Sequence, residues 1–64
     1  MIAKRVYILG VPAGNLWDIY LDDQRLARVS YHGNRLIVVK PEVFGQLTKQ
    51  QLRQAGKAID TLYG

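Results

Sequence analysis

The chain has 64 residues, no cysteine and a formal net charge of +4, from nine Lys+Arg against five Asp+Glu. A chain of this length forms one domain, and it buries only about 60% of the surface that its unfolded form exposes. The absence of cysteine excludes disulfides and thiolate zinc sites. One histidine and five scattered carboxylates indicate no metal site or cofactor. We therefore expect residues 1–64 to be a single domain, stabilised by its own core or by self-association.

The charge and the apolar segments limit the possible partners. A net positive charge favours nucleic acid, an acidic protein surface or anionic lipid, although it can also serve solubility alone. The apolar stretch Val6–Val11 is too short for a signal peptide or for a transmembrane helix, which needs about 20 apolar residues. We expect a cytoplasmic protein that does not enter a membrane.

Four segments in the first forty residues have the β-branched and aromatic content of strands. Residues 11–15 (VPAGN) have the composition of a loop, Asp22–Gln24 that of a three-residue turn, and Gly33–Asn34 that of a two-residue hairpin turn. The expected strands are Arg5–Leu9, Leu16–Leu21, Arg25–Tyr31 and Arg35–Lys40.

The turn lengths predict a register. A three-residue first turn pairs Tyr20 with Leu26. It also pairs Asp18 with Arg28, which is a favourable opposite-charge pair. The two-residue turn at Gly33–Asn34 gives the same assignment of faces, and a slip of one residue would bury Arg28. One face is then apolar: Trp17, Ile19, Leu21, Ala27, Val29, Tyr31, Leu36 and Val38.

The remaining residues predict a helix that covers this apolar face. After one possible helical turn in Glu42–Leu47, Thr48 and Gln51 have the spacing of a capping box. Gly56 beside the apolar stripe suggests a close approach to a strand. The fold class is therefore α+β: an antiparallel meander of three to four strands with one C-terminal helix packed on one face. The edge that the first strand occupies stays open. The apolar stripe is Leu52, Ala55, Ile59 and Leu62.

The sequence contains few residues in arrangements that are typical of catalytic sites. Ser30 and His32 share a strand face, but no carboxylate is placed to orient the imidazole ring. Asp22 and Asp23 are adjacent in a turn, where carboxylates usually serve as turn formers. We expect a protein that is not an enzyme.

Two basic surfaces are candidates for binding. The second sheet face carries Tyr20, Arg28, His32 and Arg35, and arginine and tyrosine can contact bases and phosphates. On the helix, positions i, i+4 and i+8 form a basic row without interleaved glutamate. The leading hypothesis is a small regulatory protein that binds DNA or RNA through the sheet face, with the helix row on phosphate. The row is Lys49, Arg53 and Lys57.

The same sheet face is also partly apolar. Leu26, Ile37 and Val39 are unusual on a surface that faces only solvent. The alternative hypothesis is an inhibitor or adaptor that binds an acidic protein through these residues and Tyr20. A homodimer that buries the face between two copies would also explain them.

Overall fold

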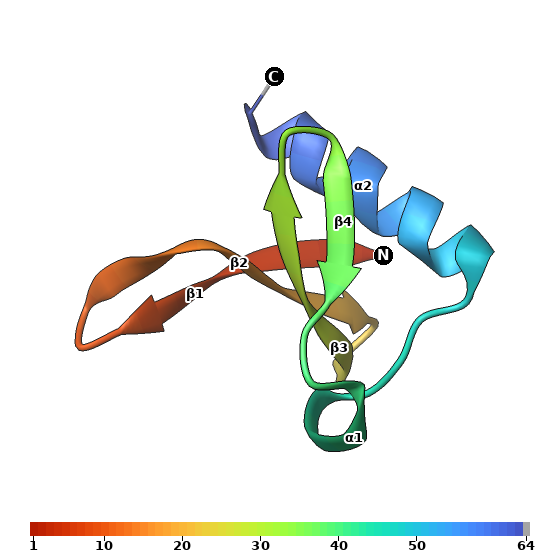
Figure 1. Cartoon of the computed structure of the whole chain (residues 1–64), viewed down its shortest axis with the longest axis horizontal. Coiled ribbons are helices and arrows are strands. Elements are labelled where there is room, and N and C mark those ends of the chain that lie inside the picture. Colours follow the sequence, from red (N-terminus) through yellow and green to blue (C-terminus); the bar gives the residue numbers. More distant parts are fainter. Residues whose placement is uncertain (64) are drawn as a thin grey trace.

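The computed structural model describes residues 1–63, which form one four-stranded antiparallel sheet and two helices. The strand order is β1-β2-β3-β4, so that β1 is the edge strand beside β2, and α2 packs on one face of the sheet (Figure 1). The α+β meander with a C-terminal helix is thus confirmed. The elements are β1 (Ile2–Ile8), β2 (Val11–Leu21), β3 (Gln24–His32), β4 (Arg35–Val38), α1 (Pro41–Phe44) and α2 (Lys49–Tyr63).

The register of the three later strands agrees with the sequence prediction at the centre of the sheet. Asp18 lies opposite Arg28, and Val29 lies opposite Val38. Side chains alternate across a strand, so this register sorts the apolar residues onto the side that α2 covers. A buried cluster forms there: Ala3, Trp17, Ile19, Ala27, Val29, Leu47, Ala55 and Ile59.

The turn between β2 and β3 differs from the prediction. Tyr20 pairs with Arg25 rather than with Leu26, because the turn has two residues and Asp22 adopts a left-handed conformation (φ 55°). Leu26 is then the extra residue of a β-bulge, which restores the predicted pairing from Ala27 onward. The structure therefore places the half-buried Leu26 against the core and not beside the outer apolar residues.

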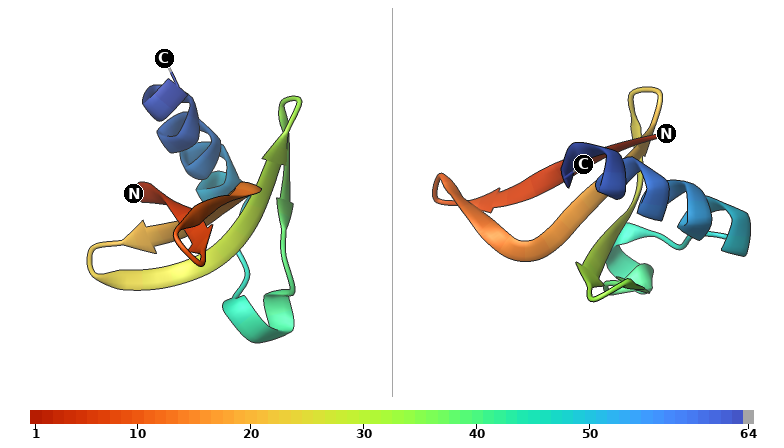
Figure 2. Two further views of the ribbon diagram at one scale, coloured as in Figure 1. Left: turned by 90° about the vertical axis from the view of Figure 1, so that its left-hand side faces the viewer. Right: turned by 90° about the horizontal axis from the view of Figure 1, so that it is seen from above.

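The first hairpin is longer than expected. Residues 11–15 are not a loop but the start of β2, and a two-residue turn of Leu9 and Gly10 connects them to β1. Gly14, with φ 54°, lies in an irregular stretch of the pairing, where Arg5 Nη1 donates to its carbonyl oxygen over 3.1 Å. The far half of this hairpin projects from the body of the molecule (Figures 1 and 2).

The predicted start of α2 is confirmed by two reciprocal hydrogen bonds. The Gln51 backbone N–H donates to Thr48 Oγ1 over 3.1 Å, and the Thr48 N–H donates to Gln51 Oε1 over 2.9 Å. These bonds satisfy two backbone donors that a helix start leaves without partners. In the apolar stripe, Ala55 and Ile59 are fully buried, whereas Leu62 stays 60% exposed.

The close backbone approach occurs at Gly45 and not at Gly56. A Cβ added at Gly56 would meet nothing within 4 Å, so the predicted contact there is wrong. A Cβ added at Gly45 would overlap the carbonyl oxygen of Leu26. Gly45 follows α1 and has φ 109°, a conformation that favours glycine. The glycine therefore lets the chain cross β3 closely between the two helices.

Candidate functional site

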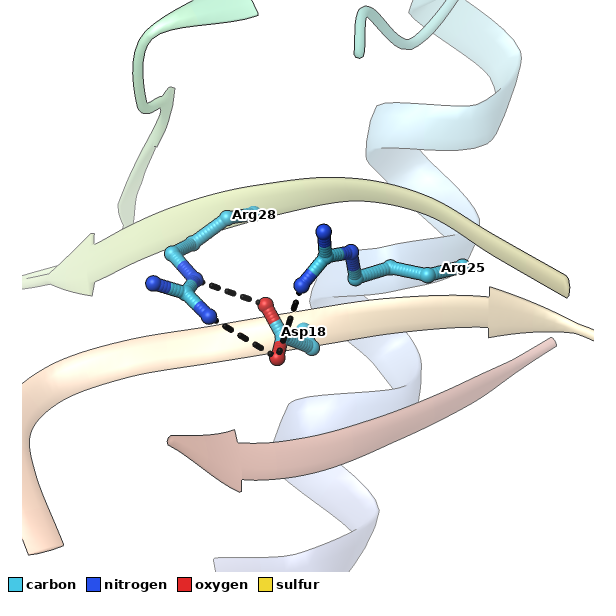
Figure 3. A network of polar contacts seen from close by, with 3 residues as sticks. All are labelled: Asp18, Arg25 and Arg28. Atoms are coloured by element: carbon cyan, nitrogen blue, oxygen red, sulfur yellow. Dashed lines mark hydrogen bonds and ion pairs between the residues drawn. The ribbon is translucent and has the colours of Figure 1, made fainter. Parts of the chain in front are cut away.

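The centre of the outer sheet face is an ion-pair network around one carboxylate (Figure 3). Arg28 Nε donates to Asp18 Oδ1 over 2.8 Å, and Arg28 Nη2 donates to Oδ2 over 3.3 Å. Arg25 Nη1 lies 3.8 Å from the same Oδ2. The hydrogen bond to Asp18 raises the pKa of Arg28. Asp18 thus balances part of the positive charge that the sequence places on this face.

Aromatic rings contact both arginines of this network and also Lys4 beside it. The Arg28 guanidinium lies 4.3 Å from the centroid of the Phe44 ring, and that of Arg25 lies 5.3 Å from it. At the β1 side, Lys4 Nζ lies 4.7 Å from the Tyr20 ring. Such cation–π contacts contribute about 0.5–1 kcal/mol when exposed. Tyr20 and Arg28, two predicted binding residues, are therefore engaged within the fold.

Phe44 was missed by the sequence analysis, and it is the residue by which α1 reaches the network. The available signal was a lone phenylalanine in the segment after Pro41, the first residue of α1. Its target could not be inferred, because only the backbone crossing at Gly45 brings α1 against β3.

The end of the outer face near the β3–β4 turn is more open. His32 Nδ1 and Asn15 Nδ2 lie 3.0 Å apart, within hydrogen-bond distance. Arg35 lies opposite His32 in the register and is exposed. Among the described residues, no ion pair involves Arg35. This arginine therefore keeps its charge available to an external partner.

The predicted apolar residues of the outer face do not form one patch. Leu26 packs against the core, and Val39 is half-buried with its backbone N–H donating to the Arg28 carbonyl over 2.8 Å. Ile37 alone of the three is largely exposed, at 59%. β1 lies beside β2 in the sheet and covers none of them.

The basic row of α2 lies in a different layer from the outer-face network. α2 packs on the opposite face of the sheet (Figure 2). Lys49, Arg53 and Lys57 are all exposed. Asp60, the one acidic residue of α2, accepts a hydrogen bond of 2.8 Å from the Tyr31 hydroxyl. Within residues 1–63 no ion pair neutralises the row. The structure thus separates the predicted site residues into two surfaces.

The position of the row along α2 is also electrostatically unfavourable, because its first residue lies near the N-terminal end of the helix. Lys49 lies in the first turn of α2, which contains no acidic residue. The N-terminal end of a helix carries partial positive charge, so a cation there is unfavourable by a few tenths of a kcal/mol. The row is therefore a concentration of positive charge that the described fold does not compensate.

Comparisons with known protein families, with curated proteins and with solved structures found no match. In the part of the chain that the structure describes, no three His, Cys, Asp or Glu side chains gather as metal ligands. No helix in residues 1–63 is long and apolar enough to cross a membrane. The fold and its surfaces define a small basic α+β domain with an uncompensated cationic helix.

Proposed function

We propose that the chain is a small non-enzymatic protein that binds nucleic acid, with the basic row of α2 as its principal contact. One observation carries this proposal: the row is exposed and has no ion pair within residues 1–63, whereas Arg25 and Arg28 share Asp18. A cation that already has a partner gains less from a phosphate than a solvated one does. The outer-face network therefore serves mainly to hold β2, β3 and α1 together.

The geometry of α2 suits contact with a sugar–phosphate backbone. Lys49 and Lys57 are eight residues apart, which is about 12 Å along a helix. Long cationic side chains at this spacing can follow several phosphates and position the protein without reading sequence. The exposed Gln50 and Gln54 lie on the same helix, and glutamine can bond to base edges. Affinity should be mainly electrostatic, with limited sequence preference.

Arg35 is the remaining contact that we assign from the outer face. It lies at the β3–β4 turn, and β3 is joined to the C-terminal part of α2 by the hydrogen bond between Tyr31 and Asp60. A backbone that follows the row toward the end of α2 approaches this turn. Arg35 thus adds one contact beyond the three of the row.

The dependence of affinity on salt tests the proposal. For B-DNA, each phosphate contact contributes about −0.9 to the slope of log K against log[salt], and about −0.7 for single strands. We expect the triple variant Lys49→Gln/Arg53→Gln/Lys57→Gln to bind a fluorescent duplex or single-stranded RNA with a slope shallower by about 2–3.

A charge-matched control separates the row from net charge. The variant Lys4→Gln/Arg25→Gln/Lys40→Gln loses the same charge from other parts of the chain and should keep most of the slope. Equal losses in both variants would show that net charge alone drives binding. Failure of the unaltered protein to bind either nucleic acid at low salt contradicts the proposal. Capture of one acidic protein after nuclease treatment favours the adaptor hypothesis.

A further inference from the structure

The turn of the first hairpin is chemically unlike the other two. Asp22–Asp23 and Gly33–Asn34 use residue types that tolerate a left-handed backbone. In the first turn Leu9 holds that conformation, with φ 51°, and its side chain is 99% exposed. A bulky residue is disfavoured in this region of φ. Leu9 thus carries two unfavourable free energies, one from its strained backbone conformation and one from the exposure of an apolar side chain to water. No contact within the hairpin buries this side chain.

The whole end of the hairpin shares this exposure. Tyr7 and Ile8 are each 60% exposed, and Val11 is 61% exposed. The sequence has no charged residue between Val6 and Trp17. We call residues 7–12 the arm tip. An uncharged, convex, apolar tip is a poor match for a phosphate backbone and a good match for an apolar groove.

A groove with a partly apolar lining lies between the start of β1 and the C-terminal half of α2. It consists of two adjoining hollows of about 400 and 240 Å³, which share Met1, Ala58 and Thr61. The larger hollow is also lined by Gln54 and by Lys57, the last residue of the basic row. Three large apolar side chains that line it remain about half exposed or more. They are Ile2, Leu21 and Leu62.

A molecule cannot fill this groove with its own arm. Leu9 is seven residues along the extended β1 from Ile2, a distance of about 23 Å at 3.3 Å per residue. The hairpin also projects away from the body rather than folding back (Figure 1). The apolar tip and this partly apolar groove can therefore meet only when they belong to different copies of the chain.

We propose that the chain self-associates, with the arm tip of one copy seated in the groove between β1 and α2 of a second copy. A reciprocal exchange about a twofold axis closes the assembly as a dimer. It covers seven of the nine large apolar side chains that are exposed in the described part of the chain, leaving only Ile37 and Val43.

The exposed area is of the right size for such a dimer. A fully exposed side chain of this size presents on the order of 150–200 Å². Seven side chains that are about half or more exposed thus supply most of the roughly 800 Å² per partner that a standard interface buries. Lys4 and Arg5 lie in the middle of the edge strand β1, and such charges oppose pairing of two edges. We therefore infer that the arm tip of one copy inserts into the groove of the other, and that the two β1 strands do not pair to extend the sheet.

The variant Leu9→Asn tests this proposal without threatening the fold. Asparagine tolerates the left-handed conformation, so the urea midpoint of the monomer should rise or stay unchanged. Sedimentation velocity over a dilution series should show a monomer–dimer equilibrium for the unaltered protein. For Leu9→Asn we expect association weaker by about tenfold or more. An unaltered protein that stays monomeric, or a variant that dimerises equally well, overturns the proposal.

Two further variants identify the surfaces that meet. Val43→Asn removes an exposed apolar side chain outside tip and groove and should leave association unchanged. Leu62→Glu should weaken it by placing a charge in the groove. Mixing Leu9→Asn with Leu62→Glu restores one intact tip–groove contact, so the mixture should associate more than either alone. If the mixture associates no more than either variant alone, the proposed contact of tip with groove is wrong. If the protein is monomeric and binds anionic phospholipid vesicles, and if Leu9→Asn abolishes that binding, the proposal is wrong and the arm tip contacts a membrane instead.

Discussion

Asp18 is the residue at which a single substitution tests the electrostatics of the outer sheet face. Asp18→Asn keeps the shape of the side chain and removes the charge that Arg25 and Arg28 share. The side chains of Asp18 and Arg28 are 13% and 22% exposed, so the pair is neither fully buried nor on the open surface. Loss of an exposed pair costs at most about 1 kcal/mol, whereas breaking a buried pair costs about 3–5 kcal/mol. We expect the free energy of unfolding to fall by about 2 kcal/mol, or about 8–15 °C in Tm for a domain of this size.

A double-mutant cycle isolates the pairwise contribution. Arg28→Gln alone should also destabilise, but the double variant should lose less than the sum of the two, with a coupling of about 1 kcal/mol or more. Arg25→Gln is the control, because its contact of 3.8 Å is long and its side chain is 39% exposed. It should cost at most about 0.5 kcal/mol.

Urea unfolding at fixed protein concentration measures the four free energies of the cycle and that of the Arg25→Gln control. The signal is the fluorescence of Trp17, which is the only tryptophan and is 2% exposed in the folded state. A coupling below about 0.3 kcal/mol would refute the reasoning, since it lies within the additivity of independent sites.

Four further substitutions test other parts of the fold, three by the same urea assay and one by the pH dependence of stability. Gly45→Ala should destabilise by about 2 kcal/mol or more, because the new Cβ overlaps a β3 carbonyl in a conformation that favours glycine. Gly56→Ala should stabilise by about 0.5–1 kcal/mol, since it lies inside a helix with open space around it; equal effects at the two glycines would contradict the backbone path. Thr48→Ala should cost about 1 kcal/mol through loss of the cap, and a cost near zero would show that the cap does not stabilise α2. The hydrogen bond to Asp60 raises the pKa of Tyr31 above its ordinary value of 10.0. The stability that this bond contributes is therefore complete at neutral pH and is lost as the pH rises from about 10 through the higher folded-state pKa. Tyr31→Phe should remove that alkaline loss, and an unchanged pH profile would contradict the bond.

The features that could be predicted from the sequence are those fixed by short-range rules. The Gly33–Asn34 turn sets the pairing of β3 with β4 by itself. The desolvation cost of Arg28 selects one of two faces for β3, whatever the details of the preceding turn. Thr48 marks the start of α2 because the capping box needs only residues within one helical turn.

The features that could not be predicted depend on contacts between distant segments. The bulge at Leu26 lies where Gly45 crosses the β3 backbone, and no local pattern reveals that crossing. Pro12 and Gly14 are typical of loops, yet a strand tolerates both at the edge of an irregular hairpin. The position of α2 on the face opposite to Arg28, by contrast, agrees with the prediction from its apolar stripe.

The most direct measurement for the proposed function is a titration of ¹⁵N-labelled protein with a short duplex, followed by amide chemical shifts. The Leu9→Asn variant should be used, so that any self-association does not overlap with the titration. We predict shifts along the exposed side of α2 from Lys49 to Lys57 and at Arg35, with small changes at Asp18 and Arg28. Shifts centred on Asp18 and Arg28, or no shifts at low salt, would contradict the assignment of binding to the basic row of α2.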